Sequence, residues 1–218
     1  AEGGLGDDAL PLAAAALLAA LAVQLRARRC IPSVYWLAVV LVSVSGTLLT
    51  DGLTDGLGVS LFVSTGGFAL ALAATFAAWY ASERTLSIHT ITTRRRELFY
   101  WAAILFTFAL GTAAGDLAAE QLGLGYAPSA LMFGGMIAAV AVAHYAFRAN
   151  AVLAFWAAYV LTRPFGASLG DLLSQPREAG GLGLGTVGTS AAFLAVILAL
   201  VALLGAGTRR DGRAARPT

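Results

Sequence analysis

The sequence predicts an all-α, polytopic helical membrane protein built of parallel two-helix repeats. Three observations predict this fold: the chain is strongly apolar, its charges are divided between two sides, and one helix pattern occurs three times. Of the 218 residues, 59% are hydrophobic and only 12% are charged, and the mean hydropathy is +0.79. A soluble domain carries about 25% charged residues. We therefore expect membrane spans and short connectors to account for the whole chain.

Seven apolar stretches are long enough to cross a bilayer, whose hydrocarbon core of about 30 Å requires about 20 helical residues. They lie near residues 9–25, 35–52, 58–80, 98–117, 127–147, 150–172 and 186–206. We expect seven spans in a single transmembrane domain, 1–218. This domain is divided into a half repeat 1–30, three repeats 31–84, 96–148 and 150–207, and a basic tail 208–218.

The charged residues predict the orientation. All fourteen basic residues are arginine, and twelve of them follow the first, third, fifth or seventh stretch, whereas nine of the twelve acidic residues lie on the other side. Because cytoplasmic loops are rich in arginine, we expect a bacterial plasma-membrane protein with this chain's N-terminus outside and its C-terminus cytoplasmic. The basic balance then reflects membrane orientation, so the lipid bilayer is the expected partner and nucleic acid is not. The absence of lysine excludes a retinal protein, which needs a lysine amine.

One helix pattern occurs three times, at intervals of 65 and 55 residues. Each copy carries a tryptophan, a glycine and two polar residues in constant register: Trp36, Gly46, Asp51 and Asp55; Trp101, Gly111, Asp116 and Glu120; Trp156, Gly166, Asp171 and Gln175. Because each repeat is a pair of helices, successive copies enter the membrane in the same direction, around an axis along the membrane normal. A Leu-Gly pair joins the two helices of each repeat, and Leu5-Gly6 has the same form. We therefore expect the first helix of a further repeat to precede Ala1.

The repeated tryptophans and glycines have structural interpretations. Trp36, Trp101 and Trp156 begin their helices beside arginine-bearing loops, so we expect them to be interfacial anchors. The glycines belong to pairs of small residues four apart, which let helix backbones approach closely in lipid.

The repeated carboxylates are the candidate site. Asp51 and Asp55, like Asp116 and Glu120, are four residues apart and are expected to share a helix face. With Asp171 they would lie at one depth on the external side. Several oxygen ligands around one axis suit a hard divalent cation or a proton path. The alternative is that each carboxylate bonds a neighbouring repeat or sits in headgroup water.

Arg163 breaks the repeat, because the other copies carry Ser43 and Phe108 at its position. A charge inside a span needs a partner, and Asp51 or Asp116 are the expected ones. Pro164 follows it and predicts a kink. Arg163 is either part of an anion site or a salt bridge that locks the repeats together.

Several segments carry a family resemblance: Thr90-Ile91-Thr92-Thr93, Phe99-Tyr100-Trp101, Gly111-Thr112-Ala113-Ala114-Gly115-Asp116 and Leu161-Thr162-Arg163-Pro164-Phe165-Gly166-Ala167. The chain resembles, over essentially its whole length, a bacterial family of multi-pass membrane-anchored proteins built of tandem two-helix repeats of unknown function. That family typically has four repeats, and this chain departs from it in lacking the first helix. The resemblance supports the fold and implies no activity.

The leading functional hypothesis is a transporter or channel for a small solute or cation. Its external site comprises Asp51, Asp55, Asp116, Glu120 and Asp171, with Arg163 as gate or counter-charge. The alternative is a non-catalytic structural or accessory subunit of a membrane assembly, as a homo-oligomer or with other chains. No motif of a metalloprotease, a serine hydrolase or a phosphate-binding loop occurs, so no catalytic residue and no cofactor is expected, and the identity of any metal is left open.

Overall fold

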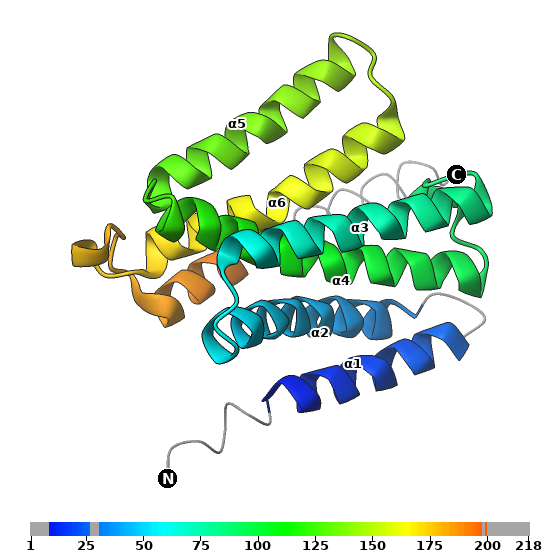
Figure 1. The fold of residues 1–218 in the computed structure, drawn as a ribbon, viewed down its shortest axis with the longest axis horizontal. Helices are drawn as coiled ribbons and strands as arrows, with labels where there is room; N and C mark the ends of the chain where they lie inside the picture. The colour runs from blue at the N-terminus through cyan, green and yellow to red at the C-terminus, as the bar shows by residue number, and fades with distance from the viewer. Residues whose placement is uncertain (1–8, 27–30, 198, 200–218) are drawn as a thin grey trace, which may run out of the picture. The chain divides into compact units, whose positions relative to one another are not determined.

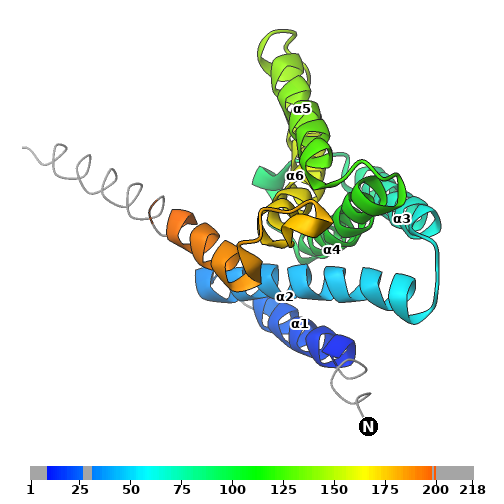
Figure 2. The same ribbon diagram turned by 90° about the vertical axis from the view of Figure 1, so that its left-hand side faces the viewer.

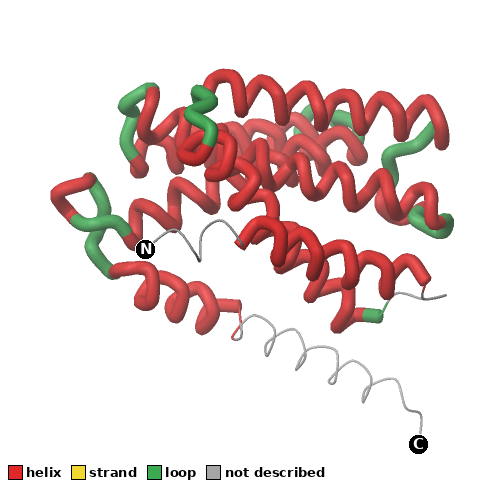
Figure 3. Tube along the Cα trace, turned by 60° about the horizontal axis from the view of Figure 1, so that its bottom comes forward, coloured by secondary structure: helices red, strands yellow, loops and turns green. Residues whose placement is uncertain are grey.

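The computed structural model describes residues 9–26, 31–197 and 199, and within them the chain consists of helices and their connections (Figure 1). Six long helices follow one another: α1 (Ala9–Arg26), α2 (Pro32–Asp51), α3 (Leu61–Glu83), α4 (Arg94–Asp116), α5 (Tyr126–Tyr145) and α6 (Ala151–Ser174). The described residues contain no strand, as the tube in Figure 3 makes plain. The expected all-α class is therefore confirmed for this part of the chain.

Among the residues that the structure describes, six helices are long and apolar enough to cross a membrane. The candidate spans that contain α2 and α4 extend to Ser33–Gly56 and Arg94–Gln121. Of the seventh expected span, 186–206, the structure describes the shorter apolar helix Gly185–Ile197. The residues beyond Ile197 lie outside the described part, except for position 199, so the expected basic tail 208–218 lies wholly outside it. The first eight residues of the half repeat and residues 27–30 also lie outside it.

Local sequence explains where the helices begin and end. The hydroxyls of Ser60 and Thr93 accept hydrogen bonds from the amides of Val63 and Arg96, which caps the first turns of α3 and α4. Pro32 lies in the first turn of α2, where its missing amide proton costs nothing. At the other end of α3, Arg84 takes a left-handed conformation with φ 56°, which terminates the helix.

The chain divides into two compact units, Ala1–Ser168 and Leu169–Thr218. In the first unit, α2, α4 and the start of α6 run in one direction, while α1, α3 and α5 run in the other (Figure 1). Neighbouring helices pack as hairpins, with α1 against α2 and α3 against α4, and α1 and α2 also lie side by side in Figure 2. The first helices of the three repeats therefore share one direction, as parallel repeats require.

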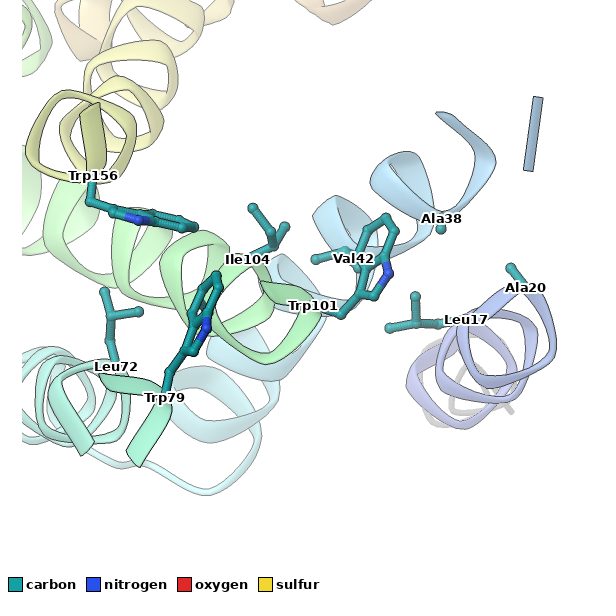
Figure 4. Close-up of a cluster of buried hydrophobic side chains, with 10 residues drawn as sticks. Leu17, Ala20, Ala38, Val42, Leu72, Trp79, Trp101, Ile104 and Trp156 are labelled. Carbon is teal, nitrogen blue, oxygen red and sulfur yellow. The ribbon is translucent and has the colours of Figure 1, made fainter. Parts of the chain in front are cut away.

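The core of the first unit gathers around three indole rings, those of Trp79, Trp101 and Trp156 (Figure 4). Trp101 and Trp156 are only 3% and 4% exposed. The expectation that they are interfacial anchors is wrong, because the neighbouring helices bury both rings. Trp36, the equivalent residue of the first repeat, is 65% exposed, which fits an anchor facing the lipid interface.

The second unit contains the end of α6, the 3-10 turn η4 (Arg177–Ala179) and the helix Gly185–Ile197. Its connector folds back on the end of α6, because the amides of Leu182 and Leu184 donate to the carbonyls of Leu172 and Leu173. Gly180, Gly183 and Gly185 have φ values of 86°, 76° and 71°. These backbone conformations are readily available only to glycine, which explains the glycine-rich connector.

Candidate functional site

Equivalent residues of the first two repeats touch each other between α2 and α4. The hydroxyls of Tyr35 and Tyr100 are 2.8 Å apart, and those of Thr47 and Thr112 are 3.5 Å apart. Both pairs join residues separated by 65 positions, which is the interval between the repeats. The two helices therefore face each other with corresponding surfaces, one pair near the start of each helix and one pair further along.

Gly46 and Gly111, which occupy equivalent positions, contact the next repeat in the same way. A Cβ added at Gly46 would meet Cβ of Phe108 at 2.8 Å and the amide nitrogen of Ala109 at 3.1 Å. Gly111, the equivalent of Gly46, lies directly against the side chain of Arg163, which is the equivalent of Phe108. One contact is thus repeated from α2 to α4 and from α4 to α6.

A second pair of equivalent positions, Thr50 and Gly115, also lies against the backbone of the next repeat. Thr50, which is fully buried, donates its hydroxyl to the carbonyls of Gly46 and Ala109, at 3.2 and 3.1 Å. Gly115 occupies the equivalent position in α4, and an added Cβ there would lie 3.7 Å from the carbonyl oxygen of Pro164. Since Pro164 is the equivalent of Ala109, the small residues of the first two repeats act as close-packing positions, as expected from the sequence. In the third copy an added Cβ at Gly166 or Gly170 would meet nothing within 4 Å among the described residues, so the expectation is not met there.

Arg163 lies in the interior of the candidate span Ala151–Ser174 and extends across α4 to reach α2. Its guanidinium donates from Nη2 to the hydroxyl of Thr47 at 2.9 Å, and its Cζ lies 4.8 Å from the centre of the Phe108 ring. Asp116, one of its two expected partners, acts on it electrostatically. The partner that sequence reasoning missed is Thr47, which is 116 residues away. We call Thr47, Thr112 and Arg163 the polar seam.

The carboxylates of the first two repeats lie where α2 and α4 change into π-helical turns. Asp51 and Asp116 are the last residues of the α-helices and are half-buried. Asp55 and Glu120 lie in the π turns η1 (Gly52–Gly56) and η3 (Leu117–Gln121), and both are exposed. In these turns the amides of Leu57 and Leu122 donate five residues back, to Gly52 and Leu117. The expected α-helical register between the two carboxylates is therefore replaced by a wider turn, although Asp51 still interacts electrostatically with Asp55.

The third copy of the helix pattern, in α6, continues as an α-helix past its aspartate. Asp171 lies within α6, which continues to Ser174, and the amide of Gln175 donates four residues back to the carbonyl of Asp171. This turn is an ordinary α-helical one. Asp171 belongs to the second unit, whereas the other five candidate residues belong to the first. The shared depth of all five carboxylates stays a prediction.

The described residues contain no group of three or more His, Cys, Asp or Glu side chains that could hold a metal ion. A hard divalent cation requires several oxygen ligands around one point. Asp51 interacts with Asp55, and the described carboxylates form no group of three that could surround such an ion.

A polar cluster lies where α3 ends and α4 begins, at the end of α4 away from its π turn. Arg96 donates from Nε to Glu83 at 2.8 Å and from Nη1 to the carbonyl of Thr90 at 2.8 Å. Beside it, Trp156 donates its indole proton to the carbonyl of Leu86 at 2.8 Å. These bonds fix the connection between α3 and α4 against α6. This part of the loop is therefore anchored to the core.

The fold and these repeated contacts define the protein as a helical, membrane-type chain assembled from tandem two-helix repeats. The chain belongs to the family described as Repeat of Unknown Function (DUF347), whose model matches residues 34–85, 99–150 and 154–209. This confirms the resemblance drawn from the sequence. No curated protein matches the chain significantly. No solved structure does so either.

Proposed function

We propose that the protein transports a small solute across the membrane along the polar seam, around a pseudo-symmetry axis that relates the repeats. The single observation that carries this proposal is the position of Arg163. Its charged group lies inside a candidate span and contacts both other repeats, through Thr47 and Phe108. An ionisable residue at such a place is costly and typically marks a solute or ion pathway.

In this proposal the carboxylates at the C-terminal ends of α2 and α4 act on the solute as it enters. Asp51 and Asp116 would select for charge where the solute enters, and Asp55 and Glu120, on the exposed π turns, would form an outer vestibule. π-helical turns occur frequently at functional sites, and two of them occur here at equivalent positions. In the proposed orientation this end faces outward and the arginine-rich loops face the cytoplasm.

Flux into proteoliposomes tests the proposal. Purified protein would be reconstituted and assayed with radiolabelled rubidium, choline, alanine and pyruvate, so that a cation, a zwitterion and an anion are each represented. Saturable uptake of one solute is expected, and Asp116→Asn is expected to abolish it while the protein still elutes as a single folded species. Glu178→Gln, which removes a carboxylate at an exposed position outside the proposed pathway, is the control and is expected to retain the flux. Unchanged flux in Asp116→Asn would remove the carboxylate role, and absence of any uptake would remove transport.

One observation favours a second function, that of a structural or accessory subunit. The contacts of Gly46 with Phe108 and of Gly111 with Arg163 bring the first helices of the repeats into direct backbone-to-side-chain contact, which is the geometry of a tightly packed bundle. An accessory subunit would co-purify with partner chains from its native membrane under mild detergent and would give no flux when reconstituted alone.

A further inference from the structure

Three arginines are exposed where α3 ends and α4 begins: Arg84, Arg94 and Arg95. Arg84 directly follows the candidate span Leu61–Glu83. Arg94 and Arg95 are the first residues of the candidate span Arg94–Gln121. All three therefore stand at the limit of an apolar segment, where a bilayer changes from hydrocarbon to headgroups. We call these three residues the arginine patch.

The positive charge of the patch is only partly neutralised by the protein. Glu83 accepts from Arg96 at 2.8 Å and lies 3.8 Å from Nε of Arg95. The other two arginines of the patch form no ion pair with any residue that the structure describes, and neither does Glu97. Segment 83–97 contains four arginines and two carboxylates, which leaves a net charge of +2 with its histidine neutral.

The backbone that carries the patch is held in place by the core. Arg96 donates from Nη1 to the carbonyl of Thr90 at 2.8 Å, and the indole of Trp156 donates to the carbonyl of Leu86 at 2.8 Å. Because this backbone is already ordered, a ligand bound there pays little of the entropy cost of ordering a loop. The arginines are therefore presented on a fixed surface.

Exposed apolar side chains adjoin the patch on both helices. Leu98, which is 54% exposed, follows Arg94 and Arg95 by one helical turn and shares their side of α4. Tyr80 is 53% exposed, and its carbonyl accepts from the amide of Arg84 at 2.8 Å. A phospholipid uses both features, because its phosphate binds arginine through parallel hydrogen bonds and its acyl chains cover apolar groups. A soluble phosphate would use only the arginines.

We propose that the arginine patch binds the phosphate of an anionic phospholipid, whose acyl chains lie against Leu98 and Tyr80. Basic residues at the cytoplasmic end of a membrane span are attracted to anionic lipid in this way. In the orientation expected from the sequence, the patch faces the cytoplasmic leaflet. The site lies outside the polar seam, so it goes beyond the proposed transport function and is tested separately from it.

Native mass spectrometry of the full chain in detergent would measure the binding of dioleoyl-phosphatidylglycerol. Dioleoyl-phosphatidylcholine, with the same acyl chains and no net charge, is the reference lipid. The test variants are Arg94→Gln and Arg95→Gln, alone and together, and the pair Arg94→Lys with Arg95→Lys, which keeps both charges. Arg177→Gln is the matched control, because Arg177 is also exposed but belongs to the second unit.

The wild-type protein and Arg177→Gln are expected to bind phosphatidylglycerol saturably and more tightly than phosphatidylcholine. Each single glutamine variant should weaken phosphatidylglycerol binding about fivefold and the double variant about 25-fold, because one arginine near an anionic lipid surface contributes about fivefold. Binding of phosphatidylcholine should not change. The double lysine variant should retain most of the binding, and it decides the matter if the double glutamine variant does not fold.

Three results would overturn the inference. The first is equal affinity of the wild-type protein for the two lipids. The second is a loss of phosphatidylglycerol binding in Arg177→Gln as large as in the double glutamine variant. The third is saturable binding of inorganic phosphate that the double glutamine variant abolishes while phosphatidylglycerol binding stays unchanged, which would assign the patch to a soluble anion.

Discussion

Replacing Gly46 by alanine is expected to push α2 and α4 apart, because the two backbones meet at this residue. The added Cβ would lie 2.8 Å from Cβ of Phe108, 3.1 Å from the amide nitrogen of Ala109 and 3.2 Å from the carbonyl carbon of Phe108. All three atoms belong to the backbone or to the base of a side chain, so no rotamer change relieves the overlap. Overpacking of this kind costs about 1–3 kcal/mol.

The loss should appear as a lower melting temperature. For a chain of this size, 1 kcal/mol corresponds to about 2–4 °C, so we expect Gly46→Ala to lower the midpoint by about 2–12 °C. The assay is thermal unfolding of detergent-solubilised protein, followed by tryptophan fluorescence and by the size-exclusion peak that remains after heating.

Gly166→Ala is the matched control, since Gly166 occupies the same repeat position and an added Cβ there meets nothing within 4 Å in the described residues. Its melting temperature should stay at the wild-type value or rise slightly, because alanine is the better helix former by about 0.5–1 kcal/mol. Equal melting temperatures for Gly46→Ala and Gly166→Ala would refute the packing argument.

The remaining predictions concern the anchored end of α3 and α4. Trp156→Phe keeps an aromatic ring but removes the indole N–H that bonds the carbonyl of Leu86, so it should cost at least about 1 kcal/mol and speed tryptic cleavage of the loop; an unchanged cleavage rate would contradict this. Arg96→Gln should destabilise the protein more than Arg95→Gln, because Arg96 is 23% exposed at 2.8 Å from Glu83 and Arg95 is 68% exposed at 3.8 Å. Because an ion pair that is open to solvent contributes little, thermal melting of Arg95→Gln should match wild type, and a larger loss there than in Arg96→Gln would overturn the assignment.

The repeat explains why so much of the fold could be predicted from the sequence. An apolar run of span length has few structural options in lipid, because every backbone group must be bonded within the segment. The glycine positions were equally predictable, since Gly46 and Gly111 recur in register and close packing is what such residues provide. The order and direction of the described helices follow from these two patterns.

The tryptophans were harder to place. Trp36, Trp101 and Trp156 share one repeat position, yet the first is exposed and the other two are buried. The sequence pattern is the same for all three, and only the neighbours differ: Trp101 packs among α1 and α2 residues such as Leu17 and Val42, and Trp156 packs against Phe76 and Trp79. Burial depends on which helices surround a position, and a local pattern does not carry that information.

Only part of the candidate site could be predicted from the sequence. The residue types and spacing of Asp51 with Asp55 and of Asp116 with Glu120 could be found from the repeat alone. The π turns that follow Asp51 and Asp116 could not, because a π turn differs from an α turn by one residue in its hydrogen bonds.

By itself the sequence determined the apolar spans, the three copies, and the exceptional charge at Arg163, because hydrophobicity, periodicity and residue identity are properties of the chain in order. Tertiary structure alone decided that Arg163 bonds Thr47, and that Gly46 and Gly111 meet equivalent residues of the next repeat, Phe108 and Arg163. Those contacts join positions up to 116 residues apart. They depend on the rotation and approach of packed helices, which are set by the shapes of both surfaces together.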